Sequence, residues 1–214
     1  MQKFPGGLGL KLFWSTRSPF VRLVMVIAHE KGLVAQIECE QVVVAASRPN
    51  EDVMAHNPLN KLPTLVLDDG TALYDSRVIA EYFDATGNGP ALFPMAGEAR
   101  WDALRRAALG FGLLDLLVGW LPERRKAESE RDSELGAALE LKFRAAIDEL
   151  ERIAGDMAGN EFDIGQAAIG CALGYADFRY GDLDWRQGHP VLSELCDDIA
   201  GRPSFRATAH ADVY

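Results

Sequence analysis

The sequence predicts an α/β domain followed by an all-helical domain, and three observations support this prediction. Residues 10–86 alternate short β-type runs with amphipathic helical patterns. The segment GNGPALFP at 87–94 is rich in glycine and proline and marks a domain boundary. Beyond it, residues 98–158 are rich in Ala, Leu, Glu and Arg, with apolar residues at helical spacing. We therefore expect the two domains at residues 8–87 and 95–214.

The first domain should begin with a strand, a helix and a second strand. Residues 10–15 (LKLFWS) alternate in polarity and are rich in aromatic residues, which favours a strand. Ser18 and Pro19 are typical of a helix N-cap and first helical position, and the helical spacing continues to Lys31, before Gly32. Residues 37–44 predict the second strand. Because a helix joins them, the two strands should be parallel.

A hairpin and a helix should complete this domain. Residues 49–57 are polar and irregular, with room for one short helix. Residues 64–67 and 72–74 flank the turn sequence Asp68-Asp69-Gly70, which predicts an antiparallel pair of strands. An amphipathic helix should run from Ser76 to about Thr86. The domain is then a four-stranded mixed sheet of order βαβ-ββα with helices against it.

The second domain should contain only helices. Apolar spacing predicts two long helices at about 98–121 and 132–157. Asp163 and Gln166 resemble a capping box at the start of an almost uncharged helix that reaches Ala176. A helix that is apolar on all sides is buried, so this one should form the centre of the domain. A further helix is expected at 190–200, and Arg202-Pro203 should stop it.

Composition limits the classes of partner and compartment. The 214 residues carry a formal net charge of −10, which disfavours nucleic acid and acidic membrane surfaces as partners. The three cysteines are widely spaced without a CxxC, so we expect reduced, buried thiols. The N-terminal sequence has no long apolar h-region, and no 18-residue apolar run occurs, which favours the cytoplasm. The four histidines show no metal-ligand spacing, and we expect no metal.

Four motifs in a fixed order carry a family resemblance. They are SxxSPFVR at 15–22, NPLNKLPTL at 57–65, LYDSRVIAEY at 73–82 and FDIGQAAIGCALGYADFR at 162–179. Together they resemble bacterial glutathione transferases, including those related to the zeta and omega classes. The resemblance implies a thioredoxin-like N-terminal domain, an all-α C-terminal domain and the overall architecture of a glutathione transferase. It also implies a homodimer that uses glutathione as co-substrate in detoxification.

The same resemblance implies a set of glutathione-binding residues. Leu62, before a cis-Pro63, would pair its N–H and C=O with the extended tripeptide, as a strand edge does. Ser76 would hold the γ-glutamyl carboxylate, Asp75 would face the γ-glutamyl ammonium, and Lys61 would meet the glycyl carboxylate. Phe20 is the remaining glutathione-binding residue that the resemblance implies. From the residues alone, Pro63 equally suits a trans strand start, Asp75 and Ser76 an ordinary N-cap, and Lys61 a solvated surface.

Two serines are candidates for activating the thiol of glutathione. Ser18 occupies the place that the nucleophilic cysteine holds in omega-class members, and it lies at the expected helix start. Ser15 matches the first serine of the zeta-class cluster. We favour Ser18 and keep Ser15 as the alternative. From the residues alone, Ser18 is also explained as a pure N-cap and Ser15 as a loop hydroxyl.

The resemblance predicts a glutathione transferase that attacks a small hydrophobic electrophile. Two alternatives stay open. One is a binding or regulatory protein without turnover, similar to stringent starvation proteins. The other is a glutathione-dependent isomerase of the zeta kind, although Arg17-Ser18-Pro19 replaces the Cys-Ser-Trp of that class. The physiological electrophile cannot be deduced from the sequence.

Overall fold

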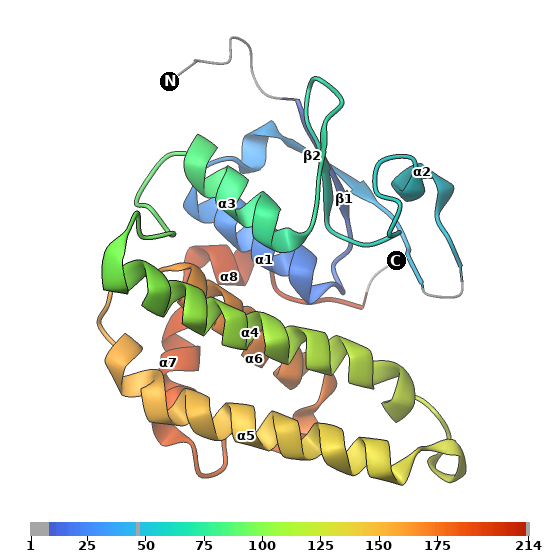
Figure 1. Cartoon of the computed structure of the whole chain (residues 1–214), viewed down its shortest axis with the longest axis vertical. Coiled ribbons are helices and arrows are strands. Elements are labelled where there is room, and N and C mark those ends of the chain that lie inside the picture. Colours follow the sequence, from blue (N-terminus) through green and yellow to red (C-terminus); the bar gives the residue numbers. More distant parts are fainter. Residues whose placement is uncertain (1–8, 46–47, 213–214) are drawn as a thin grey trace. The chain divides into compact units, whose positions relative to one another are not determined.

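The computed structural model describes residues 9–45 and 48–212, and residue 8, our expected domain start, lies outside this part. The chain divides into two compact units (Figure 1). The first comprises residues up to Ala91 together with those from Ala207 onward, and the second runs from Leu92 to Arg206. The expected second domain, 95–214, thus loses its C-terminal residues to the first unit. One reason is a hydrogen bond from Thr16 Oγ1 to Ala211 O at 2.8 Å.

The first unit is built on a four-stranded sheet of order β2-β1-β3-β4. The strands are β1 (Leu10–Trp14), β2 (Ile37–Gln41), β3 (Thr64–Val66) and β4 (Ala72–Leu73). β1 pairs with β2 in parallel and with β3 antiparallel, and β3 pairs with β4 antiparallel. This mixed topology confirms the prediction. β2 is shorter than expected because the chain of β1 turns away after Trp14, leaving little to pair beyond Val42.

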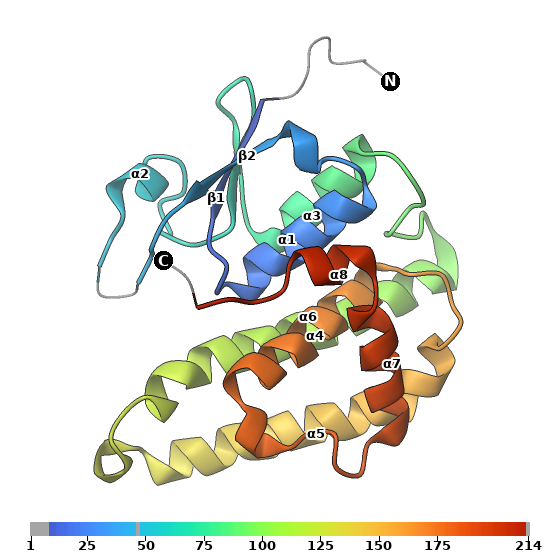
Figure 2. The same ribbon diagram turned by 180° about the vertical axis from the view of Figure 1, so that it is seen from behind.

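Two helices lie side by side against this sheet, α1 (Pro19–Glu30) and α3 (Ser76–Thr86) (Figures 1 and 2). Both begin where the sequence predicts. Gly32 has a φ of +65°, the left-handed conformation that a glycine adopts at low cost after a helix end. The short helix α2 (Glu51–Met54) and the 3₁₀ turn η1 (Val34–Gln36) lie in the connections.

The second unit is all-helical, as predicted. Its elements are α4 (Gly97–Arg124), η2 (Glu128–Glu130), α5 (Ser133–Met157), α6 (Ile164–Arg179), η3 (Gly181–Leu183), α7 (Pro190–Ala200) and α8 (Pro203–Ala207). Twelve of the 16 residues of α6 are buried, which confirms its central position (Figure 2). The sequence did not predict α8, because Pro203 that ends one helix also suits the first position of another.

The start of α6 differs in one detail from the predicted capping box. Asp163 Oδ1 accepts from the Gln166 N–H at 3.0 Å, as an N-cap should. The Gln166 amide, however, donates to Met157 O at 3.0 Å, toward the end of α5. The other Asp163 oxygen accepts from Arg106 on α4 at 2.6 Å. The start of α6 therefore also joins it to α4, through Asp163, and to α5, through Gln166.

The cysteines agree with the prediction at two of three positions. Cys171 and Cys196 are buried, and neither forms a disulfide within the described residues. Cys39 is free but exposed, so the expected burial is wrong there, because β2 lies at the edge of the sheet. Within the described residues, every helix is too short or too polar to span a bilayer.

A histidine joins α7 to α5 in the second unit. His189 Nδ1 lies 2.7 Å from Trp185 O, and its Nε2 lies 2.9 Å from Asp148 Oδ1 on α5. A carbonyl and a carboxylate only accept hydrogen bonds, so both contacts are hydrogen bonds when the imidazole is protonated and carries a proton on each nitrogen. The hydrogen bond to Asp148 is the largest of the causes that raise the pKa of His189. Glu151 on α5 accepts from the Val191 and Leu192 N–H groups beside it.

This pair should make stability depend on pH. Because the folded pKa is raised, the stabilisation is complete below the unfolded value of about 6.5 and disappears as pH rises through the folded value. We expect about 0.5–1 kcal/mol, since Asp148 is exposed and water screens the pair. Urea unfolding of wild type and His189→Gln across this range measures it. The stability difference between the two proteins should shrink above pH 6.5, and a constant difference would contradict the charged histidine.

Candidate functional site

The sheet register brings three of the sequence motifs to one end of the first unit. Phe13 on β1 lies opposite Thr64 on β3, and Leu65 lies opposite Leu73 on β4. Extending the β1–β3 register by one residue and the β3–β4 register by two, past the last paired residues, places Trp14, Pro63 and Asp75 in one row across three neighbouring strands. Strands are about 4.8 Å apart, so this row spans about 10 Å, the length of an extended tripeptide.

Ser18 lies at the N-terminus of α1. Its backbone is extended and its Oγ accepts from the Val21 N–H at 3.3 Å, which is the predicted N-cap. A hydroxyl that accepts in this way keeps its own hydrogen for another partner. The first turn of α1 contains no acidic residue, so no carboxylate there neutralises the positive end of the helix dipole. Because Pro19 has no backbone N–H, the first backbone N–H of this turn belongs to Phe20.

Ser15 occupies a different position, in the turn between β1 and α1. Its Oγ accepts from the Arg17 N–H at a longer 3.4 Å, and its carbonyl accepts from the Ser18 N–H at 3.3 Å. Ser15 and Ser18 are both half-buried. The two hydroxyls are therefore both near the row described above, but Ser18 alone belongs to the helix start.

The Leu62–Pro63 peptide bond is cis, which confirms the prediction for this proline. Leu62 is half-buried, and its side chain packs against a cluster of Phe13, Val53 and Val66. Lys61, the expected partner of the glycyl carboxylate, is exposed. The segment before β3 thus presents its backbone at the same sheet end as the two serines.

Asp75 and Ser76 open α3 as predicted. Asp75 is the N-cap, and its Oδ1 accepts from the Arg77 N–H at 3.0 Å. The ordinary capping role is therefore present in the structure, and it leaves the second carboxylate oxygen for another partner. Ser76 is 3% exposed. The Tyr74–Asp75 peptide bond is also cis.

Sequence reasoning missed two buried polar residues beside this site, Asn57 and Thr64. Asn57 Nδ2 donates to Thr64 Oγ1 at 2.9 Å, and Thr64 Oγ1 donates to Lys61 O at 2.8 Å. Both lie inside the motif NPLNKLPTL. The available signal was a threonine at the start of the apolar run TLVL, where a buried hydroxyl needs a partner.

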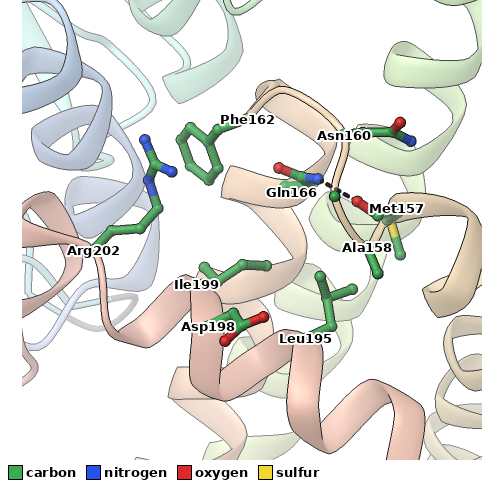
Figure 3. Close-up of a pocket in the computed structure, with 10 residues that line it drawn as sticks. Met157, Ala158, Asn160, Phe162, Gln166, Leu195, Asp198, Ile199 and Arg202 are labelled. Atoms are coloured by element: carbon green, nitrogen blue, oxygen red, sulfur yellow. Dashed lines mark hydrogen bonds between the residues drawn. The ribbon is translucent and has the colours of Figure 1, made fainter.

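A pocket of about 170 Å³ lies elsewhere, in the second unit (Figure 3). Its lining is contributed by the end of α5, the segment before α6, α6 and α7, and includes Met157, Phe162, Gln166, Leu195, Ile199 and Arg202. The Arg202 guanidinium lies 3.9 Å from the centre of the Phe162 ring. None of the predicted site residues lines this pocket.

Comparison with known proteins decides the family. Residues 17–86 match the family description "Glutathione S-transferase, N-terminal domain", and residues 133–198 match "Glutathione S-transferase, C-terminal domain". The chain belongs to the glutathione S-transferase family. Both matches fall on the halves assigned from sequence, and the observed α/β unit and helical unit are the two parts of this architecture.

Two relatives match over nearly the whole chain, and a third matches over part of it. The uncharacterized GST-like protein YibF of Escherichia coli K12 is 31% identical over 93% of this chain and 98% of its own length. A crystal structure of a family member from Pseudomonas fluorescens Pf-5 with bound glutathione has a TM-score of 0.90 at 39% identity, covering 94% of this chain and 99% of its own. A stringent starvation protein A homolog of Pasteurella multocida is 32% identical over 61% of this chain and 56% of its own length.

Proposed function

We propose that this chain binds reduced glutathione at the sheet end described above and activates its thiol for attack on a small hydrophobic electrophile. The sheet register carries the proposal: extended to Trp14, Pro63 and Asp75, it brings the N-terminus of α1, the Leu62 backbone and the start of α3 within about 10 Å of one another. The Pseudomonas fluorescens relative, 39% identical to this chain, was crystallised with bound glutathione. The extended tripeptide would lie along this row.

Each part of glutathione then meets a suitable group. The cysteinyl backbone pairs with the N–H and C=O of Leu62, as a strand added to a sheet edge would. The γ-glutamyl carboxylate lies at the N-terminus of α3, where Ser76 and the helix dipole favour an anion, and Asp75 faces the γ-glutamyl ammonium. The exposed Lys61 meets the glycyl carboxylate. The sulfur faces Ser18 and Phe20 at the N-terminus of α1.

Ser18 and the N-terminus of α1 are sufficient to favour ionisation of this thiol without a general base. A free thiol has a pKa of about 8.5, and each unit of depression requires about 1.4 kcal/mol in favour of the thiolate. A hydroxyl hydrogen bond to an anion supplies about 1.5–3 kcal/mol, and the helix N-terminus adds about 0.3–1 kcal/mol. One to two units of depression are therefore within reach of Ser18 alone. The thiolate forms the new carbon–sulfur bond as the leaving group departs from the electrophile.

Calorimetry with reduced glutathione, followed by turnover of a chloronitrobenzene, tests this function. Saturable heat and a new absorbance from the thioether are expected for the wild type. Ser76→Ala should weaken binding, because it removes a donor to the γ-glutamyl carboxylate. Folded protein that gives no heat with millimolar glutathione would overturn the proposal.

We expect Ser18→Ala to slow turnover at neutral pH by about tenfold to a hundredfold. Loss of one hydrogen bond to the thiolate raises the pKa of the bound thiol by about one to two units. The rise in rate with pH should therefore move to higher pH, while the Kd of glutathione stays within a few-fold. Because Ser18 is also an N-cap, a parallel melting curve measures its structural role. Ser15→Ala is the matched control, and if it shifts the pH profile instead, Ser15 activates the thiol.

A second candidate function is binding without turnover. The match to stringent starvation protein A homologs over 61% of this chain favours it. Glutathione binding with no reaction across a broad panel of electrophiles would support this candidate over catalysis. For either function we propose that the protein is cytoplasmic and forms a homodimer. Analytical ultracentrifugation measures the oligomeric state directly.

A further inference from the structure

A buried polar network holds the segment that carries Leu62. Asn57 is 1% exposed and Thr64 is 0% exposed, and both lie within hydrogen-bond distance of the Lys61 carbonyl. Thr64 Oγ1 donates to this oxygen at 2.8 Å, and Asn57 Nδ2 donates to it at 3.3 Å and to Thr64 Oγ1 at 2.9 Å. The carbonyl thus has two donors from buried side chains.

The same asparagine holds the other side of the loop. Asn57 Oδ1 accepts from the Leu59 N–H at 3.0 Å, and the Asn57 carbonyl accepts from the Asn60 N–H at 3.0 Å. Asn60 adopts a φ of +52°, which turns the chain sharply before Lys61. Every hydrogen-bonding atom of the Asn57 side chain is therefore engaged within residues 57–64.

The consequence for Leu62 follows from peptide geometry. Within the described chain, the cis peptide bonds are Leu62–Pro63 and Tyr74–Asp75, so the Lys61–Leu62 bond is trans. In a trans peptide the C=O and the next N–H lie in one plane and point in opposite directions. Because the Lys61 oxygen points at the buried pair Asn57 and Thr64, the Leu62 N–H points away from that pair.

We propose that Asn57 and Thr64 are positioning residues for glutathione, which fix the Leu62 N–H in the direction that pairs with the cysteinyl backbone of the ligand. This inference rests on the proposed function. Neither side chain touches glutathione; both act through the Lys61–Leu62 peptide plane. Without them the peptide could rotate, and binding would have to restore its orientation at a cost in affinity.

The test uses threonine variants that differ by one hydroxyl. Thr64→Val keeps the shape and removes the hydrogen bonds, and we expect the Kd and KM for glutathione to rise about tenfold, as for one lost hydrogen bond. The kcat at saturating glutathione and the pKa of the bound thiol should stay unchanged, because Ser18 is untouched. Thr64→Ser keeps the hydroxyl and should stay close to wild type. A general structural defect would lower kcat or the active fraction instead.

Two further variants complete the design. Thr86→Val removes a hydroxyl that donates to Tyr82 O at 2.7 Å on α3, and it should leave glutathione affinity unchanged. Asn57→Ala removes the other donor to the Lys61 carbonyl and should raise the Kd for glutathione by a similar factor. This variant tests the same carbonyl if Thr64→Val does not fold. Because both residues act on one carbonyl, the double variant should lose little more than the single variants.

The outcomes separate this inference from the proposed function. Wild-type protein that binds glutathione while Thr64→Val and Asn57→Ala bind equally well overturns the positioning role alone. Wild-type protein that does not bind glutathione overturns the proposed function and this inference with it. A rise in Kd for Thr64→Val that Thr64→Ser does not show supports the inference.

Discussion

Lys31→Met is expected to lower the free energy of unfolding by about 3–5 kcal/mol, a large part of what a typical domain possesses. Lys31 follows α1, and its ammonium lies 3.1 Å from Asp84 Oδ1 on α3. The two side chains are only 3% and 9% exposed. Methionine keeps the apolar stem and removes the charge, so the variant leaves the buried Asp84 carboxylate without this cation.

The same ammonium also holds the end of the first unit. Lys31 Nζ donates to Pro90 O at 2.8 Å and to Gly89 O at 3.3 Å, and the Lys31 carbonyl accepts from the Asn88 N–H. A Cβ on Gly87 would lie 2.5 Å from Lys31 Cβ, so the chain passes close beside this lysine. The variant therefore loosens α1, α3 and residues 87–90 together, and amide exchange in these segments should accelerate.

Lys11→Met is the matched control for this variant. Lys11 pairs with Glu40 across β1 and β2, but the two side chains are 40% and 36% exposed. A salt bridge in water contributes about 0–1 kcal/mol, so the same substitution should have little effect there. Urea unfolding and hydrogen exchange of both variants make the comparison. Equal losses in the two variants would contradict a special contribution from burial at Lys31.

Elements with a local signal could be predicted from the sequence. α1, α3 and α7 begin at the expected residues because Ser18, Asp75 and Pro190 supply caps or a fixed φ within a few residues of chain. The mixed sheet followed from the order of its elements, since a helical connection favours parallel strands and a tight turn requires antiparallel ones. These rules depend only on near neighbours.

Features that depend on distant partners could not be predicted in this way. β2 ends at Gln41 because of where β1 turns, and the side chain of Gln166 bonds to Met157 instead of closing a capping box. The contact between Thr16 and Ala211 joins residues 195 positions apart.

The candidate site shows the same division. The order of the motifs indicated Pro63 and the helix start at Ser18, whereas the bond between Asn57 and Thr64 became visible only in the folded loop. The position of Thr64 at the start of the apolar run TLVL indicates a buried hydroxyl, but the sequence does not indicate which residues it bonds.

Two glycines of α4 differ only in their distant partners, and this difference can be tested. Gly110 and Gly112 lie in one helical segment, ALGFGLL, and look equivalent in the sequence. A Cβ on Gly110 would lie 2.7 Å from the Ala168 carbonyl carbon and 2.8 Å from Ile169 N on α6. A Cβ on Gly112 would have no atom of residues 9–45 or 48–212 within 4 Å. We expect Gly110→Ala to cost about 3 kcal/mol and Gly112→Ala to be neutral or to add about 0.5–1 kcal/mol.

The cost at Gly110 should be high because α6 has no room to move away. Ala168 and Gly170 are two residues apart, so they face nearly opposite sides of α6. On the second side, a Cβ on Gly170 would lie 2.5 Å from Ile199 and 2.9 Å from Phe205, so that side is equally tight. A methyl group on Gly110 must therefore push α6 against α7 and α8 or separate it from α4. Thermal and urea unfolding of the two variants measure this, and equal stability of both would show that α6 can shift.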